Sequence, residues 1–99
     1  MNIVVVTACP TGIAHTYMAA EQLEKTAREL GQAIKVETQG AMGIENELSP
    51  EDIREADVVI FAVGIDVEQR DRFDGKKIIE VEVQDAIKNP KAVFDKLGV

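Results

Sequence analysis

The sequence has only one cysteine and one histidine, Cys9 and His15, and both lie close to its N-terminus. A single cysteine cannot form an internal disulfide, so the sequence does not indicate a disulfide-stabilised secreted scaffold. One cysteine and one histidine also fall short of the ligand set of a typical zinc site. We therefore expect a chain with a reduced thiol, no bound metal and no cofactor.

Basic residues are also scarce: 11 lysines and arginines stand against 18 aspartates and glutamates, and the net charge is −7. Because there is no basic stripe, a nucleic-acid partner is not expected. No apolar run approaches the roughly 20 residues of a membrane helix, and no signal peptide is recognisable. Repeats, low-complexity tracts and linkers are absent as well. We expect one cytoplasmic domain over residues 1–99, without direct insertion into a membrane.

Segments typical of strands alternate with segments typical of helices. Apolar or alternating stretches predict strands at residues 2–7, 34–39, 58–63 and 77–83. Three helices are predicted: one over residues 13–30, with Tyr17 on its inward face, a short one after Ser49, and one over residues 90–97. A helical turn is predicted at residues 67–72 and a plain turn at residues 84–88. This order predicts an α/β fold with an open four-stranded parallel sheet, strand order 2-1-3-4, and helices on both faces. The second strand, with one face in solvent, is expected at the sheet edge.

The stretch after the first strand, residues 7–16, reads Thr-Ala-Cys-Pro-Thr-Gly-Ile-Ala-His-Thr. A loop between a strand and a helix N-terminus presents unpaired N–H groups that suit a phosphate, and the same donors favour the anionic form of a thiol. We interpret this stretch as a phosphate-binding loop with Cys9 as its nucleophile. Ligands of open parallel sheets bind at the carboxyl ends of the strands, where the strand order reverses. The loops that begin at Gly40 and Gly64 are expected to flank Cys9 there.

The spacing of Cys9, five residues, His15 and Thr16 is similar to that of tyrosine phosphatases, which have arginine at the position of His15. Histidine replaces a permanent bidentate cation with a weaker, pH-dependent donor. A phosphatase also needs an acid for its leaving group, and Asp66 is the candidate. One alternative is therefore a cysteine-dependent low-molecular-weight phosphatase or arsenate-reductase-like enzyme. Another is a redox-sensing interaction domain, although the second cysteine that would support it is missing.

Four segments resemble the fructose-type enzyme IIB component of the bacterial phosphoenolpyruvate-dependent sugar phosphotransferase system. They are residues 9–16, 37–40, 56–57 and 72–76, and the resemblance extends over essentially the whole chain. It implies that a IIA phosphohistidine protein phosphorylates Cys9. The phosphoryl group then passes to a sugar, fructose or a closely related hexose, presented by a IIC membrane transporter. The resemblance also implies that the chain associates with the inner face of the membrane through IIC.

The same resemblance implies that the loop backbone holds the phosphoryl dianion and that His15 takes part in catalysis. The phosphate-binding residues that it indicates are Pro10, Thr11, Gly12, Ile13, Ala14, His15 and Thr16. Gln39, Gly40 and Asp66 are expected at the border of the site.

Structural explanations remain open for several of these residues. Cys9 could instead be a small buried core residue, and His15 could be a cap or packing residue at the start of the helix. The hydroxyl of Thr16, like that of Thr11, either donates to phosphate or caps the helix. Arg70 and Arg72 are either solvated surface charges or groups that help to hold the phosphoryl group.

Overall fold

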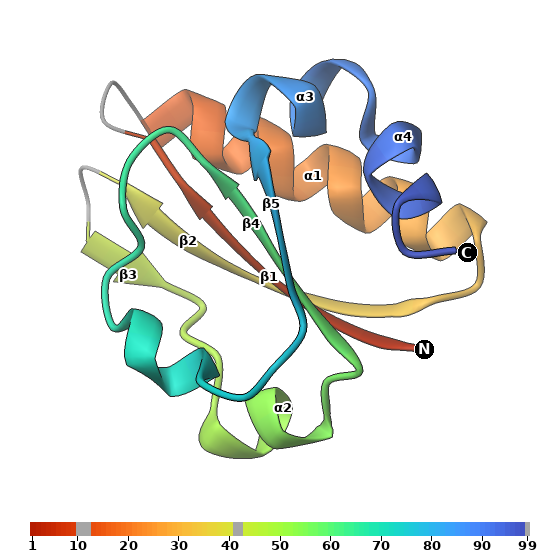
Figure 1. Ribbon diagram of the computed structural model, residues 1–99. Helices are drawn as coiled ribbons and strands as arrows, with labels where there is room; N and C mark the ends of the chain where they lie inside the picture. The colour runs from red at the N-terminus through yellow and green to blue at the C-terminus, as the bar shows by residue number, and fades with distance from the viewer. Residues whose placement is uncertain (10–12, 41–42, 99) are drawn as a thin grey trace.

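The computed structural model describes residues 1–9, 13–40 and 43–98, and the side chains of all of these except Ile13 and Ala14. Five strands form one sheet in the order β3-β2-β1-β4-β5. The strands are β1 (Asn2–Ala8), β2 (Ala33–Gly40), β3 (Gly43–Glu45), β4 (Val58–Val63) and β5 (Ile78–Glu82). Strand β1 is central and pairs in parallel with β2 and β4, and β4 pairs in parallel with β5 (Figure 1).

The short strand β3 corrects the prediction of a four-stranded, wholly parallel sheet in the order 2-1-3-4. It pairs antiparallel with β2, with Gly40 opposite Gly43 and Thr38 opposite Glu45. The four predicted strands keep their relative positions and parallel directions, but β2 is not at the edge. Three residues are too few to show an alternating pattern, and two glycines made this stretch resemble an open loop. Strand β3 occupies the hydrogen-bonding edge of β2 that the prediction left unpaired.

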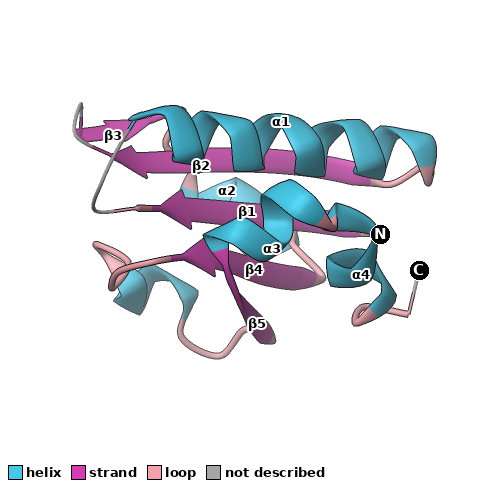
Figure 2. Cartoon of the chain, turned by 90° about the horizontal axis from the view of Figure 1, so that it is seen from above, coloured by secondary structure: helices cyan, strands magenta, loops and turns pink. Residues whose placement is uncertain are grey.

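Helices cover both faces of the sheet, as the alternation of strands and helices predicts. They are α1 (Ile13–Glu29), α2 (Pro50–Glu55), α3 (Val83–Lys88), α4 (Pro90–Asp95) and the 3₁₀ helix η1 (Arg70–Phe73). Helices α1, α3 and α4 lie on one face, and α2 and η1 lie on the other (Figure 1). Seen from above in Figure 2, α1 runs along β2 and α3 lies over β4.

The central strand β1 divides its side chains between two apolar cores. Ile3 and Val5 belong to the core under α1, α3 and α4, whereas Val4 and Val6 belong to the core under α2 and η1. All four side chains are at most 3% exposed. Burying such a side chain contributes about 1.5–3 kcal/mol, so β1 is held firmly from both faces. Cys9, which follows β1 directly, therefore has a fixed position at the carboxyl end of the central strand.

Helix α2 begins at the predicted cap. The Ser49 hydroxyl accepts a hydrogen bond from the Asp52 N–H at 3.0 Å, and the Asp52 carboxylate accepts one from the Ser49 N–H at 3.1 Å. At the other end, Lys76 Nζ donates to the carbonyl oxygens of Arg54 and Ala56 at 2.8 and 3.0 Å. This short helix is thus capped at both ends, and Lys76 ties it to the segment that follows η1.

Residues 84–88 do not form a plain turn, which corrects the prediction for this segment. They belong to α3, whose Val83 and Ala86 are buried in the core that α1 covers. Six residues make fewer than two helical turns, so the sequence offered too short a window for a helical period to be visible. Helix α4 begins at Pro90 after Asn89, as predicted, although Asn89 makes no side-chain cap hydrogen bond among the described residues.

Candidate active site

An open pocket of about 280 Å³ lies at the carboxyl ends of β1, β2 and β4, and we call it the Cys9 pocket. The residues that line it are Cys9, Gln39, Gly40, Gly43, Ile65, Asp66 and Glu68. The strand register places Ala8 opposite both Gln39 and Val63, so the three chain segments leave the sheet side by side. The structure therefore brings the three predicted border residues, Gln39, Gly40 and Asp66, together with Cys9.

The thiol of Cys9 lies in contact with the imidazole of His15. Cys9 follows directly after β1 and is 6% exposed, and its Sγ lies 3.7 Å from Nδ1 of His15. His15 is exposed and belongs to the first turn of α1. A thiol donates a hydrogen bond to a neutral imidazole nitrogen, and a thiolate accepts one from an imidazole N–H. The only cysteine and the only histidine of the sequence thus form one pair.

Part of the predicted phosphate-binding loop lies outside the described residues: Pro10, Thr11 and Gly12. The backbone of Ile13 and Ala14 forms the start of α1. Thr16 is 1% exposed, and its carbonyl oxygen accepts a hydrogen bond from Oγ1 of Thr7 at 3.3 Å. This bond joins the end of β1 to the first turn of α1.

Gln39 is buried and holds the segment after β4 through both ends of its amide group. Its Oε1 accepts a hydrogen bond from the N–H of Glu68 at 2.8 Å, and its Nε2 donates to the carbonyl oxygen of Glu68 at 3.1 Å. The same Nε2 donates to Oε2 of Glu37 at 2.7 Å. Gln39 therefore lines the Cys9 pocket and joins β2 to the opposite wall of the pocket.

A buried ion pair lies next to Gln39. Two guanidinium nitrogens of Arg72 donate to the two carboxylate oxygens of Glu37 at 2.9 and 2.8 Å, and Glu37 is 0% exposed. The Leu48 N–H also donates to Glu37, at 2.9 Å. Burial raises the pKa of Glu37, but the hydrogen bonds from Arg72, Leu48 and Gln39 outweigh this effect and hold the pKa below its usual value. Glu37 is thus a buried carboxylate that stays ionised.

The alternation of residues 34–39 predicted one solvent-facing side of this strand, which is wrong for its second half. From Val36 to Gln39 every residue is buried, because β3 pairs with this part of β2 and Arg72 of η1 covers Glu37. The sequence did contain a signal for the ion pair. Glu37 and Arg72 carry opposite charges in two of the four segments that resemble the same family.

Neither arginine of η1 lines the Cys9 pocket in the part of the chain that the structure describes. Arg72 is paired with Glu37, and its guanidinium carbon lies 4.9 Å from the centre of the Phe73 ring. Arg70 is exposed and pairs with Glu80 at 3.4 Å. Of the two alternatives left open by the sequence, these positions favour structural and surface roles over a direct hold on a phosphoryl group.

Tyr17 is not a core residue, which corrects its assignment to the inward face of the helix. It is 39% exposed, and its hydroxyl donates a hydrogen bond to the carboxylate of Glu45 in β3, which raises the pKa of Tyr17. The buried face of α1 runs instead through Thr16, Ala20 and Leu23. The true inward face therefore passes one position before Tyr17 in the first turn.

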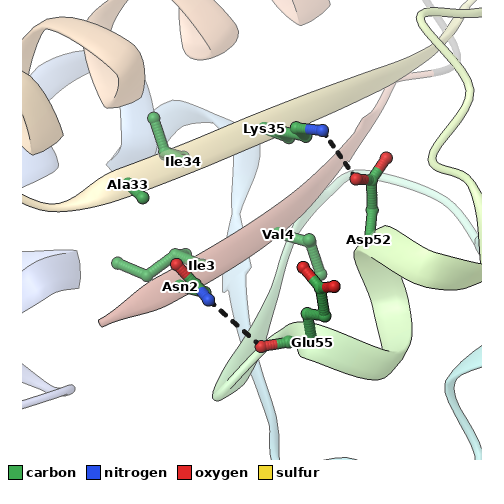
Figure 3. Close-up of a pocket in the computed structure, with 8 residues that line it drawn as sticks. All are labelled: Asn2, Ile3, Val4, Ala33, Ile34, Lys35, Asp52 and Glu55. Atoms are coloured by element: carbon green, nitrogen blue, oxygen red, sulfur yellow. Dashed lines mark hydrogen bonds and ion pairs between the residues drawn. The ribbon is translucent and has the colours of Figure 1, made fainter.

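A second, smaller pocket of about 140 Å³ lies at the opposite end of the parallel strands (Figure 3). It is lined by the first residues of β1 and β2 and by two acidic residues of α2. The ammonium of Lys35 reaches Asp52 across it at 2.6 Å, and the Asn2 side-chain amide donates to the carbonyl oxygen of Glu55 at 3.4 Å. None of the predicted site residues lies here, so this groove is separate from the candidate active site.

Neither a metal centre nor a membrane span occurs in residues 1–9, 13–40 and 43–98. Within these ranges no three His, Cys, Asp or Glu side chains gather in an arrangement suited to a metal ion. The helices described there are too short or too polar to cross a bilayer.

Comparison with known proteins places the chain in a protein family. Residues 4–96 match the family described as PTS system, Lactose/Cellobiose specific IIB subunit, where PTS stands for phosphotransferase system. The PTS system fructose-like EIIB component 2 of Escherichia coli K12 is 50% identical over 96 residues, which cover 97% of this chain and 91% of that protein. The fructose-like PTS system EIIBC component of the same strain is 52% identical over 99 residues, covering 98% of this chain and 20% of that longer protein.

A solved structure agrees with these matches. The solution structure of the Enzyme IIB subunit of the PTS system from Escherichia coli K12 superposes with a TM-score of 0.92 at 42% identity, over 98% of this chain and 90% of that one. These relatives are phosphotransferase-system components, so the phosphatase alternative is not favoured. By sequence and by fold, this chain belongs to the IIB family of the phosphotransferase system.

Proposed function

We propose that this chain is a phosphocarrier that accepts a phosphoryl group on Cys9 and passes it to a sugar during transport. The observation that carries this proposal is the setting of Cys9. The thiol follows the central strand, lines an open pocket and lies 3.7 Å from the imidazole of His15. A small core residue requires neither the pocket nor the imidazole. The family match over residues 4–96 supports the proposal that residues 1–99 act as one IIB unit.

In the first step, the donor is the phosphohistidine of a IIA protein. The Cys9 thiolate attacks phosphorus, the S–P bond forms as the P–N bond breaks, and the donor imidazole leaves. The N–H groups at the start of α1 suit the phosphoryl dianion, because a helix N-terminus offers unpaired donors and a positive dipole end. Pro10 has no N–H, so it cannot itself be a backbone donor to the phosphoryl group.

In the second step, a sugar hydroxyl attacks the phosphocysteine. The new O–P bond forms, the S–P bond breaks, and Cys9 leaves as a thiolate while the hydroxyl proton passes to a base. His15 is placed to stabilise the leaving thiolate, since its Nδ1 lies 3.7 Å from Sγ, whereas the in-line hydroxyl attacks from the opposite side of phosphorus. The names of the relatives support fructose or a similar sugar as the acceptor. The EIIBC relative carries IIB and IIC in one name, which supports a IIC membrane component as the partner and a place at the inner face of the membrane.

The histidine at position 15 suits a carrier better than a phosphatase. An arginine clamp together with an acid for an alkoxide leaving group would favour hydrolysis, which would drain the phosphorylated pool. Here the leaving groups are an imidazole and a thiolate, so Asp66 has no alkoxide to protonate and is a border residue of the pocket. A phosphocysteine that hydrolysed as fast as a phosphatase intermediate would contradict this assignment.

The direct test is transfer from a IIA protein phosphorylated on its histidine, followed by intact mass. We expect one phosphoryl adduct on the wild-type chain and none on Cys9→Ser. Cys9→Ser replaces one atom in a buried position and should keep the fold, which circular dichroism checks. An adduct that persists in the folded Cys9→Ser variant would overturn the assignment of Cys9.

A further inference from the structure

A buried carboxylate with no part in the proposed chemistry lies directly behind the Cys9 pocket. Glu37 is 0% exposed and accepts four hydrogen bonds: two from Arg72, one from the Leu48 N–H and one from Gln39. Its partner Arg72 lies 35 residues away along the chain, in η1. A buried ion pair is weak support for stability taken alone, because desolvation offsets much of its attraction. The direction of its hydrogen bonds is more informative.

The charge of Glu37 and the backbone of Glu68 require the same orientation of the Gln39 amide. An ionised carboxylate can only accept hydrogen bonds, so it must face the Nε2 end of Gln39, which lies 2.7 Å from it. The Oε1 end then has to face the other way, towards the N–H of Glu68 at 2.8 Å. Nε2 also reaches the carbonyl oxygen of Glu68 at 3.1 Å. If the amide were turned over, its NH₂ group would face the N–H of Glu68 and its oxygen would face the carbonyl oxygen of Glu68. A donor would then meet a donor, and an acceptor would meet an acceptor.

Glu68 belongs to the segment that forms one wall of the Cys9 pocket. The segment leaves β4 at Val63 and supplies Ile65, Asp66 and Glu68 to the lining. The Gly64 N–H donates to the Ala8 carbonyl oxygen at 2.7 Å, which holds the start of this segment beside Cys9. The bonds between Gln39 and Glu68 hold its far end against β2. The width of the pocket between these walls therefore depends on Gln39.

We propose that Glu37, held in place by Arg72, is a positioning residue for phosphoryl transfer at Cys9. It acts through Gln39, whose fixed amide holds the 64–68 wall at the distance that the incoming phosphoryl group requires. This inference rests on the proposed function, because it concerns the same pocket. It gives a common purpose to two segments of the chain, residues 37–40 and 72–76, that do not contain the nucleophile.

Two variants test this role, one by removing the charge of Glu37 and the other by removing the amide of Gln39. Glu37→Gln keeps the shape of the side chain, but its amide NH₂ must face a donor from Arg72, Leu48 or Gln39. Gln39→Leu keeps the approximate volume and removes both bonds to Glu68. The matched control is Lys35→Met, which removes an exposed ion pair with Asp52 from the same strand, at the end remote from Cys9 (Figure 3).

Two measurements separate positioning from general stability. The first is amide hydrogen exchange at Glu68, which we expect to be slow in the wild type and in Lys35→Met and faster in both pocket variants. The second is single-turnover transfer from phosphorylated IIA, measured over a range of IIA concentrations. We expect the limiting rate to fall about tenfold or more in both variants, the size of one lost hydrogen bond to a charged or buried group, with little change in the half-saturating IIA concentration.

The outcomes are decisive in either direction. Folded variants that match the wild-type limiting rate overturn the inference while leaving the proposed function intact. A uniform loss that also affects Lys35→Met, or a change confined to the half-saturating concentration, overturns it as well. If Glu37→Gln does not fold, the double variant Glu37→Leu with Arg72→Met removes the carboxylate without leaving a buried charge unpaired, and the same two measurements on it decide the matter. A wild-type chain that accepts no phosphoryl group overturns the proposed function, and the inference falls with it.

Discussion

At the scale of single residues, the proposed chemistry depends on the contact between Cys9 and His15. The distance of 3.7 Å from Sγ to Nδ1 lets the imidazole donate to a thiolate or accept from a thiol. His15 is exposed while Cys9 is 6% exposed, so the imidazole is the member of the pair that meets solvent and partners. The geometry therefore favours a catalytic role for His15 over the packing role that the sequence left open.

The first prediction concerns His15→Ala. We expect phosphoryl transfer to Cys9 to slow by about 10- to 100-fold, because a hydrogen bond to a charged group contributes about 1.5–3 kcal/mol. The fold should persist, since the imidazole is exposed. Rapid-quench transfer from phosphorylated IIA gives the rate, and circular dichroism gives the fold. Loss of the fold would move His15 to a structural role.

At the scale of elements, η1 connects β4 and β2, the strands that lead into the two walls of the Cys9 pocket. Phe73 packs edge-on against Phe61 of β4, with ring centres 5.3 Å apart, and this contact anchors η1 on the sheet. From that anchor Arg72 reaches Glu37 in β2, and Lys76 reaches the carbonyl oxygens at the end of α2. Residues 70–76, which comprise η1 and the segment that follows it, thus join β2, β4 and α2 on the face of the sheet away from α1.

The second prediction concerns Arg72→Met. We expect the free energy of unfolding to fall by about 3–5 kcal/mol, because the buried carboxylate of Glu37 loses its counter-charge. Urea unfolding at neutral pH measures the change. The double variant Glu37→Leu with Arg72→Met should be more stable than Arg72→Met alone, since no buried charge is left unpaired.

The control for that prediction is Arg70→Met in the same element. Arg70 and Glu80 are both more than half exposed, and an exposed pair contributes about 0–1 kcal/mol. Equal losses from Arg70→Met and Arg72→Met would show that the Glu37–Arg72 pair has no special weight.

At the scale of the whole molecule, the parallel sheet gathers the residues of the candidate site at the carboxyl ends of its strands. The ends of β1, β2 and β4 lie in register, so Cys9, Gln39 and the 64–68 segment meet although they are far apart in sequence. The smaller pocket, with the Lys35–Asp52 pair, lies at the opposite ends of the strands and contains none of the predicted site residues. The location of the site follows from strand direction and strand order.

The third prediction concerns the pH dependence of stability. The pKa of Glu37 is lowered in the folded chain from an ordinary value of 4.5, so its ionised form stabilises the fold at and above that pH. This contribution is lost as the pH falls below 4.5 and through the folded pKa. We expect the difference in unfolding free energy between wild type and Glu37→Gln to be constant above about pH 6 and to shrink in acid. The other carboxylates titrate in both proteins and cancel. A difference that grew in acid would contradict the lowered pKa.

Strong local signals explain why much of the fold could be predicted from the sequence. Continuous apolar runs marked β1 and β4, and the Ser49 cap marked α2. The clustering of Cys9 and His15 marked the candidate site, and the structure places the two side chains in contact. The failures share a cause. Strand β3 and helix α3 are too short to show a period, and their positions depend on tertiary contacts.

The buried carboxylate was harder to predict for a different reason. Alternation indicates which residues share a face of a strand, but it does not show whether that face is later covered. Glu37 and Gln39 look like solvent-facing residues until β3 and η1 are placed over them. Arg72, 35 residues away, supplies the counter-charge of Glu37, and the backbone of Glu68 pairs with both ends of the Gln39 amide. Both partners are distant in the sequence.

The central claim is that Cys9 carries the phosphoryl group as a thiophosphate. The most direct measurement is phosphorus NMR of the wild-type chain after reaction with phosphorylated IIA, compared with Cys9→Ser. We expect one thiophosphate resonance in the wild type, absent from Cys9→Ser, that disappears when the sugar and the IIC component are added. A phosphoramidate resonance on His15, or no adduct together with turnover of an aryl phosphate, would contradict it.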